Sequence, residues 1–395
     1  MREQGVLDLL RVEGPMSRAE IARRCSVSKP TVSSDVETLL ALGLVEERGR
    51  GTSGNGRPGR LVAFNPSAGY VVGMDVGGTT TRAVLADLDG RVVTNHREAT
   101  EAGSADALLR QIAGVVERLV DARNGDAPIL EIAIGTPGVV DAVRRRVAIA
   151  PNLPALESDG FLDRLDVALG RPATVLNDVN AATRGELEHG AGRGVDDLVY
   201  VSIGTGLGLG VVVAGVVHHG VGGRAGELGL LPYPPGRDTI LEDALSGRGI
   251  RAHSLAVGGD GDPATAFRQA DAGLDPGASA IERFQTDLAW ALVAVVTLLD
   301  PRRIVLGGGI GLRCAPFIDR IRADVARLAG FDIDVRVAEL GDDAGLTGAV
   351  ATALEPARDV RRWMEGGPQR SIPRHHHPLP VNDIANTHAT PLEEP

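Results

Sequence analysis

Residues 75–79 combine a carboxylate, two glycines and a hydroxyl directly after an apolar run. The run Tyr70–Val76 predicts a buried strand, and a second apolar run after Thr79 predicts a returning strand. The backbone N–H groups of Gly77 and Gly78 can approach phosphate oxygens because glycine has no side chain in the way, and the threonine adds a hydroxyl donor. Asp75 can hold a magnesium ion beside them. The spacing therefore predicts a phosphate-binding hairpin.

Two further glycine clusters follow strand-like runs. The first comes about 130 residues later, after the predicted strand 198–203, which suggests a duplicated α/β body whose halves close on one nucleotide. The second follows the apolar run 303–306, where a backbone without side chains can lie against an adenine ring. The residues assigned to nucleotide binding are Asp75, Gly77, Gly78, Thr79, Gly204, Thr205, Gly206, Gly208, Gly307, Gly308 and Gly309.

Three short stretches with helical periodicity occupy the N-terminal 41 residues. Glu13-Gly14-Pro15 ends the first, Ser17 begins a capping box for the second, and Ser28 caps the third after a tight turn. Helix, short turn and helix is an arrangement that enters a DNA major groove, although a plain three-helix bundle gives the same spacing. The polar residues at the exposed start of the third helix, suited to base edges and phosphates, are Lys29, Thr31, Ser33 and Ser34.

Two strand-like runs at 44–47 and 60–64 flank a glycine-rich segment, residues 49–59. This pattern predicts a wing beside the third helix. Its arginines, which can reach an adjacent minor groove or its phosphates, are Arg48, Arg50, Arg57 and Arg60. Since Glu46 and Glu47 weaken the positive field on the strand, the tip is the expected contact. Together the helices and the wing predict a winged helix-turn-helix that binds double-stranded DNA.

The distribution of charge agrees with DNA contact at the N-terminal end. Residues 1–60 hold 10 Lys or Arg and 8 Asp or Glu, a net charge of +2, whereas the whole chain carries −11. Because an acidic body repels a phosphate backbone, DNA contact must be concentrated in the head.

The composition is that of an ordinary globular protein, with 395 residues, 43% hydrophobic and 24% charged. This length predicts two or three domains. No run approaches the roughly 18 apolar residues of a membrane span, and the charged start lacks the apolar core of a signal peptide, so a cytoplasmic protein without a membrane partner is expected. Cys25 and Cys314 are far apart and outside any metal-spaced cluster, which favours two buried thiols.

Taken together, five motifs in order resemble the ROK family of bacterial sugar kinases and sugar-responsive repressors, which are built on the actin-like ATPase fold. The resemblance covers roughly residues 5–355 and includes Gly56-Arg57-Pro58 and Asn65-Pro66. The motifs are residues 75–79, 135–141, 177–182, 204–210 and 226–229.

The resemblance implies a sugar cleft and, for a kinase, a catalytic base. Asp178 matches the base, and a carboxylate that faces a hydroxyl can take its proton as that oxygen attacks a γ-phosphoryl group. The alternatives are structural: Asp178 can cap a helix, Asn152 can cap a turn and Glu242 can be solvated. The residues matching hexose-binding positions are Asn152, Asn177, Asp178, Glu227 and Glu242.

The chain departs from the family in its zinc loop. The positions of the expected histidine and cysteine ligands are Leu230, Tyr233, Pro235 and Ile240. None of these side chains ligates zinc, so no zinc is expected, and we predict that Leu230, Leu231, Tyr233 and Ile240 hold the loop by packing. Loss of the family histidine also removes one polar contact with the sugar.

Two C-terminal features complete the prediction. The apolar helical stretch 281–300 is expected to pack in the core or between subunits, since such regulators bind paired half-sites as dimers or higher homo-oligomers. Beyond about residue 360 the sequence becomes rich in proline and histidine, which predicts a disordered tail.

The predicted fold class is α/β, with a winged helix-turn-helix at residues 1–65, a two-lobed sugar kinase-like sensor at 66–358 and a tail at 359–395. The predicted function is a transcription regulator, in the first instance a repressor, whose partners are operator DNA and a sugar effector. Two alternatives stay open: an active ATP-dependent sugar kinase with a DNA-binding head, and a nucleotide-binding regulator that needs no sugar. Because the glycine motifs of a nucleotide site are present in the sequence, Mg-ATP stays open as a cofactor.

Overall fold

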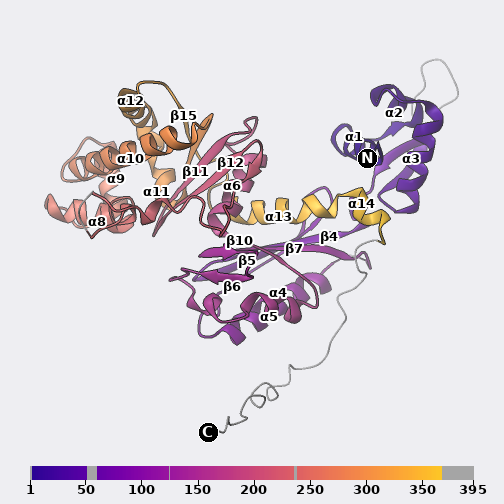
Figure 1. The fold of residues 1–395 in the computed structure, drawn as a ribbon, viewed down its shortest axis with the longest axis horizontal. Helices are drawn as coiled ribbons and strands as arrows, with labels where there is room; N and C mark the ends of the chain where they lie inside the picture. Colours follow the sequence, from indigo (N-terminus) through magenta and orange to yellow (C-terminus); the bar gives the residue numbers. More distant parts are fainter. Residues whose placement is uncertain (1, 51–59, 124, 235–237, 367–395) are drawn as a thin grey trace, which may run out of the picture.

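The computed structural model describes residues 2–50, 60–123, 125–234 and 238–366. A small N-terminal unit, here called the head, lies beside a body of two lobes (Figure 1). Lobe I holds the sheet formed by residues 70–177 and lobe II the sheet formed by residues 198–337. Helix α13 (Ala344–Ala357), yellow in Figure 1, extends from the junction of the lobes toward the head.

Serine caps start the second and third helices of the head, as predicted. The Ser17 hydroxyl accepts the backbone N–H of Glu20 at 3.2 Å, and the Ser28 hydroxyl accepts that of Thr31 at 3.3 Å. Apolar side chains at helical spacing then pack the three helices against one another. The helices are α1 (Arg2–Glu13), α2 (Arg18–Arg24) and α3 (Lys29–Ala41).

The wing is a hairpin with one additional strand. β2 (Val45–Arg50) pairs antiparallel with β3 (Arg60–Phe64), which confirms the two predicted strands. A two-residue strand, β1 (Met16–Ser17), pairs with the other edge of β3. It was not predicted, because two residues are too few to show a period. The central part of the wing tip, residues 51–59, lies outside the described residues.

Both lobes contain a five-stranded sheet with the same connectivity, which confirms the predicted duplication. In each sheet the first three strands are antiparallel, and two later strands add in parallel beside the first. Lobe I has β4 (Tyr70–Val76), β5 (Thr80–Asp87), β6 (Val92–Ala99), β7 (Ile129–Thr136) and β10 (Thr174–Asn177) in the order β10-β7-β4-β5-β6. Lobe II has β11 (Leu198–Ile203), β12 (Leu207–Val213), β13 (Val216–Val217), β14 (Arg303–Gly307) and β15 (Asp334–Val337) in the order β13-β12-β11-β14-β15.

Amphipathic helices cover these sheets. In lobe I, α4 (Ala105–Asp121) and α5 (Phe161–Leu169) turn their apolar faces toward the strands. In lobe II the predicted apolar stretch is α10 (Gly277–Leu299), whose buried residues confirm core packing. The remaining elements are β8 (Val139–Asp141), β9 (Arg146–Ala148), α7 (Leu241–Ala244), α8 (Gly247–Ala256), α9 (Pro263–Asp271), α11 (Gly308–Gly311), α12 (Ile318–Ala329) and the short 3₁₀ turns η1 (Pro66–Ala68), η2 (Pro154–Glu157), η3 (Leu228–Leu230), η4 (Leu312–Phe317) and η5 (Gly341–Asp343).

Two helices pack tightly against each other at the junction of the lobes. α6 (Asp178–His189) crosses α13 so closely that a Cβ at Gly348 would lie 1.7 Å from the Ala181 carbonyl oxygen. A Cβ at Gly185 would lie 2.3 Å from the Ala344 carbonyl oxygen. Only glycine permits this approach at either position, so the two helices are expected to move together.

The chain remains ordered beyond the predicted start of the tail. Residues 359–366 include a short helix, α14 (Val360–Met364), and Val360 is fully buried. The prediction that the tail begins at residue 359 is therefore wrong, because an apolar contact with the head stabilises this segment. The rest of the predicted tail, residues 367–395, lies outside the described residues.

Two smaller findings concern the cysteines and the membrane. Cys314 is buried, as predicted, but Cys25 is only partly buried, because it lies in the turn between α2 and α3. Among the helices of the described residues, none has the length and apolar character needed to cross a membrane.

Candidate functional site

The start of α3 presents polar side chains at the surface of the head. Lys29 and Ser34 are exposed, while Thr31 and Ser33 are partly exposed. The Thr31 hydroxyl lies 2.7 Å from that of the capping Ser28, so the cap fixes its position. The opposite face of the helix carries the buried residues of the head core. The four predicted DNA-contacting residues therefore share the accessible first turns of one helix, the part of a recognition helix that meets base edges.

The described arginines of the wing are paired with glutamates. Arg48 Nε donates to Glu46 at 2.6 Å, and Arg60 donates to Glu47, which also accepts from Arg18 at 2.8 Å. Hydrogen bonds from Arg60 and Arg18 hold the pKa of Glu47 below its usual range. These pairs reduce the positive field on the strands, as predicted. The side chain of Arg50, and Arg57 entirely, lie outside the described residues.

Four carboxylates from both lobes are linked by electrostatic interactions: Asp178 with Asp75 and Glu227, and Glu227 with Glu242. Asp75 lies next to the last residue of β4, Asp178 begins α6, and Glu227 and Glu242 come from lobe II. Burial, followed by the charge of Asp75, raises the pKa of Asp178 to about 6. Burial, and then the charge of Glu242, also raises the pKa of Glu227. We call these four residues the acidic cleft, after the sugar cleft predicted from the family resemblance; such a set of acceptors suits a ligand with several hydroxyl donors.

Asparagines adjoin the acidic cleft in two ways. The side chain of Asn177 caps α6 by accepting the N–H groups of Val179 and Asn180, and its amide donates to the Gly138 carbonyl at 3.0 Å. Asn177, not Asp178, is therefore the N-cap of this helix, which leaves one Asp178 oxygen for a ligand. Asn152 is exposed, and its backbone carbonyl oxygen would lie 2.5 Å from a Cβ at Gly78.

Glu242 connects the acidic cleft to the second glycine hairpin. One of its oxygens accepts the Leu207 backbone N–H at 3.1 Å, and the other accepts from Arg248 at 2.8 Å. A Cβ at Gly206 would lie 2.9 Å from the same carboxylate. The residue is thus not simply solvated. It positions the hairpin and remains within the group of acidic side chains.

The third glycine cluster lies next to the same hairpin. Gly308 has a φ of +73°, and a Cβ there would lie 2.5 Å from the Ile203 carbonyl oxygen. A Cβ at Gly307 would lie 2.1 Å from the Tyr200 hydroxyl, which occupies the space beneath it. The cluster thus packs on the strand that leads into the Gly204–Gly210 turn, and the contact with Tyr200 was not predicted.

Asp75 forms an ion pair with Arg82 that was not predicted from the sequence. Arg82 Nη2 donates to Asp75 at 2.6 Å and to the Asp342 carbonyl, and Arg82 Nη1 donates to Asp343 at 3.2 Å. Since Asp75 and Arg82 are opposite each other in the β4–β5 pair, hairpin register was a usable signal. One oxygen of the carboxylate predicted to hold magnesium, Asp75 Oδ2, is therefore paired with a guanidinium, so binding of the ion through this oxygen requires the pair to open.

The loop that replaces the expected zinc site is held differently from the prediction. Leu230 and Leu231 are 48% and 41% exposed, so the prediction that they pack the loop is wrong. Instead, the Tyr233 hydroxyl donates to Asp287 at 2.8 Å and its ring lies against Trp290. The packing prediction is therefore confirmed for Tyr233, which lies against the core of lobe II, whereas its hydrogen bond with Asp287 was not predicted. Ile240 forms a β-bridge with Pro232, and Pro235 lies outside the described residues.

A winged helix-turn-helix joined to a duplicated α/β body is a helix-turn-helix head on a sugar kinase-like scaffold. The chain belongs to the ROK family, whose pattern matches residues 71–355, and a helix-turn-helix domain pattern matches residues 4–48. This family includes sugar kinases such as glucokinase.

Three similar proteins represent the regulators and the kinases of this family. The xylose repressor of Bacillus subtilis (strain 168) is 33% identical over 219 residues, which cover 54% of this chain and 56% of the repressor. A glucokinase of Streptomyces coelicolor is 30% identical over 318 residues, covering 73% of this chain and 98% of the enzyme. The crystal structure of a ROK family transcriptional regulator, homolog of the E. coli MLC protein, matches with a TM-score of 0.77 at 22% identity over 92% of this chain and 98% of its own.

Proposed function

We propose that this chain is a DNA-binding transcriptional repressor of carbohydrate metabolism genes, controlled by a sugar or sugar derivative in the acidic cleft. The proposal is carried by one observation: the head shares a hydrophobic cluster with α13, the helix whose first turn lies beside Asp75. The likeness to xylose repressors along the sequence supports it. The chain matches only about half the length of the Bacillus repressors, so its partners are part of the proposal.

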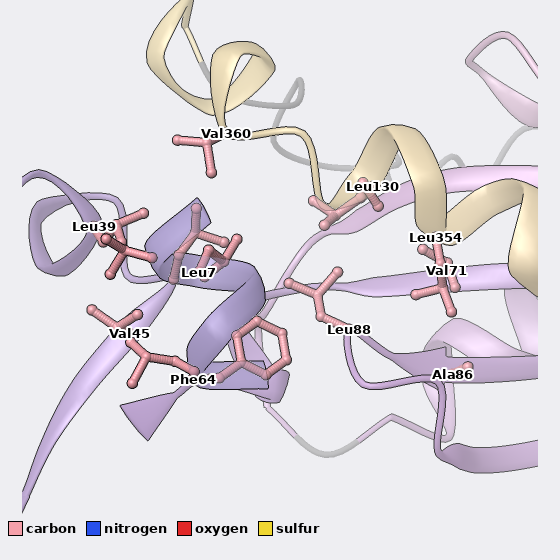
Figure 2. Packing of buried hydrophobic residues seen from close by; sticks show 14 of the residues in the cluster. Leu7, Leu39, Val45, Phe64, Val71, Ala86, Leu88, Leu130, Leu354 and Val360 are labelled. Carbon is pink, nitrogen blue, oxygen red and sulfur yellow. The ribbon is translucent and has the colours of Figure 1, made fainter. Parts of the chain in front are cut away.

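The shared cluster joins the head to both lobe I and α13. Leu7 of α1 and Phe64 of β3 belong to it, together with Leu88, Leu354 and Val360 of the body. Figure 2 shows these side chains spread from Leu7 and Phe64 of the head, past Leu88, to Leu354 beside Val71 in the body, with Val360 near the top of the view. Each fully buried aliphatic side chain contributes about 1.5–3 kcal/mol relative to exposure, so this contact orients the head.

Helix α14 adds polar contacts at the same place. The Val360 backbone N–H donates to Gln4 Oε1 in α1 at 2.9 Å, and Arg362 pairs with Glu131 of β7 at 2.6 Å. The indole N–H of Trp363 donates to the Ala357 carbonyl at 2.8 Å, which fixes α14 to the end of α13. The head is thus held from one side by the C-terminal end of the sensor.

The other end of α13 lies at the acidic cleft. A Cβ at Gly345 would lie 3.6 Å from the Asp75 carboxyl group, and α13 packs on α6, which begins with Asp178. Closure of the lobes on a sugar shifts α6, and the close helix crossing passes that shift along α13 to the head. A ligand that binds the closed state better thereby selects one geometry of the two heads in a homodimer.

The test is a mobility-shift assay with the promoter region of the gene that encodes the chain. We expect one carbohydrate from a panel that includes D-xylose and D-glucose to weaken DNA binding by the wild type. Asp178→Ala should bind the same DNA but lose this response. Asp271→Ala, which removes an exposed carboxylate from α9, should keep it. If no carbohydrate changes the shift, sugar control is excluded.

Kinase activity is the second candidate function. A pKa of about 6 suits Asp178 to act as a general base near neutral pH, and the two glycine hairpins predicted to bind nucleotide support this candidate. The Arg82–Asp75 pair opposes it, since a guanidinium holds one oxygen of the carboxylate predicted to bind magnesium. ADP release with hexoses and amino sugars decides the question, because equal rates for wild type and Asp178→Ala rule out the kinase. DNA binding that depends on ATP and not on sugar would identify the third alternative.

A further inference from the structure

A cavity lies on α6, lined by residues from both lobes. Its volume is about 330 Å³, at the small end of the range for ligand pockets. Val140 and Thr174–Asn177 line it from lobe I, and Val216 and the loop that follows line it from lobe II. Residues of α6 and α13 complete the wall. We call it the interlobe cavity. Of the predicted sugar-binding residues, it contains Asn177 alone.

One buried polar atom in this wall, Oδ1 of Asn180, has no hydrogen-bond partner. Asn180 is 5% exposed, and its Oδ1 accepts no hydrogen bond. A buried acceptor left unpaired costs about 1–3 kcal/mol, so a ligand that donates a hydrogen bond here gains by removing that cost. The amide group of Asn180 faces Nδ1 of His219 at 3.3 Å. With Nδ1 as acceptor, the histidine carries its proton on Nε2 and is a donor.

The charged groups of the cavity neutralise one another. Arg184 donates to Glu188 within α6 and to Glu355 of α13 at 3.0 Å. Both Arg184 and Glu355 line the cavity. The rest of the wall is dominated by valine. A fully charged ligand would find no uncompensated partner, whereas a neutral ligand with both donors and acceptors finds both.

We infer that the interlobe cavity binds a small neutral polyhydroxy compound of monosaccharide size, at a site separate from the acidic cleft. Hydroxyl groups donate to Asn180 and accept from His219, and the carbon skeleton packs on the valines. Because the occupant contacts both lobes and α13, it changes the freedom of the lobes to close. The inference does not require the acidic cleft to bind sugar.

The test counts sugar sites by isothermal titration calorimetry, with D-xylose and D-glucose as probes up to 10 mM. Val216→Trp fills the cavity from a side chain that is 64% exposed, so folding tolerates it. We expect this variant to bind one sugar molecule fewer per chain than wild type. Val167→Trp is the matched control, since Val167 is 75% exposed on α5 and outside the cavity. It should bind as many as wild type.

Two further variants separate the sites. Asp178→Ala should retain binding that Val216→Trp removes, which shows that this binding is independent of the acidic cleft. Asn180→Ala should weaken the same binding about fivefold, the effect of one hydrogen bond. The inference is overturned if Val216→Trp binds as many sugar molecules as wild type. It is also overturned if wild type binds neither D-xylose nor D-glucose. A change in oligomeric state by light scattering with an unchanged site number would identify the cavity as a subunit contact, which also overturns it.

Discussion

At the scale of single residues, Asp178 makes ligand binding depend on pH. Its pKa of about 6 lies above the ordinary value, so the carboxylate proposed to accept a sugar hydroxyl is largely ionised at pH 7 and becomes protonated as the pH falls through 6. We expect the sugar affinity of the acidic cleft to fall about tenfold between pH 7 and pH 5. Calorimetric titration measures it. Asp178→Asn should show weaker binding with a flat profile, and an equally steep profile in that variant would contradict the assignment.

Arg82 determines whether Asp75 can meet a metal ion. Arg82→Met keeps a long side chain but removes the guanidinium, which leaves the carboxylate without its 2.6 Å partner. We expect MgCl₂ to stabilise this variant against thermal unfolding by about 1.4 kcal/mol at ten times its Kd, with no such effect on wild type. Arg91→Met, which alters an exposed arginine outside the cleft, is the control. Equal stabilisation of wild type would show that Arg82 does not exclude the ion.

The identity of the acidic-cleft residues was easier to predict from the sequence than the hydrogen bonds and ion pairs that they form. Asp178, Glu227 and Glu242 came from the family resemblance, and the structure brings Asp178 close to Asp75 and Glu227, and Glu227 close to Glu242. The roles of Asn177 as a helix cap and of Arg82 as a counter-ion were not anticipated. Both depend on which groups meet after folding, and only the β4–β5 register, which pairs Asp75 with Arg82, was accessible beforehand.

At the scale of elements, the capped helices and apolar strands were predictable because their signals are local. Ser17 and Ser28 each begin a helix, and the duplicated strand order follows from the two glycine hairpins. Helix α14 was missed for the opposite reason. Its five residues lie next to a proline-rich sequence, and its order depends on burial of Val360 against the head. A tertiary contact of this kind leaves no period in the chain.

The same contact predicts how the sensor and the head are coupled. Val360→Asp places a charge in the shared cluster and should detach α14 from α1. We expect the variant to bind operator DNA but to lose the sugar response, so that a change of at least fivefold in DNA affinity falls toward none. Val167→Asp, on the exposed face of α5, should keep the response. Titration of labelled DNA with and without sugar measures both, and a full response in Val360→Asp would exclude α14 as the link.

At the scale of the whole molecule, charge is divided between a head that is weakly positive and a body that is strongly acidic. The chain carries −11 overall, so approach of the body to DNA is unfavourable and contacts must come from the head. The described wing arginines are already paired with Glu46 and Glu47. Lys29, exposed at the start of α3, has no counter-ion among the described side chains that would reduce its attraction to phosphate.

Lys29→Ala should therefore weaken binding to all DNA sequences alike and lower the slope of log K against log salt by about 1, the value for one phosphate contact. Fluorescence anisotropy at several salt concentrations, with specific and random duplexes, gives both quantities. Arg251→Ala is the control, because this exposed cation lies on α8 of lobe II and its removal should leave the slope unchanged. If Lys29→Ala lowers affinity for the specific duplex alone, the residue contacts a base edge instead of a phosphate. If neither variant alters the slope, α3 does not face the DNA backbone at its start, and the orientation proposed for the head is wrong.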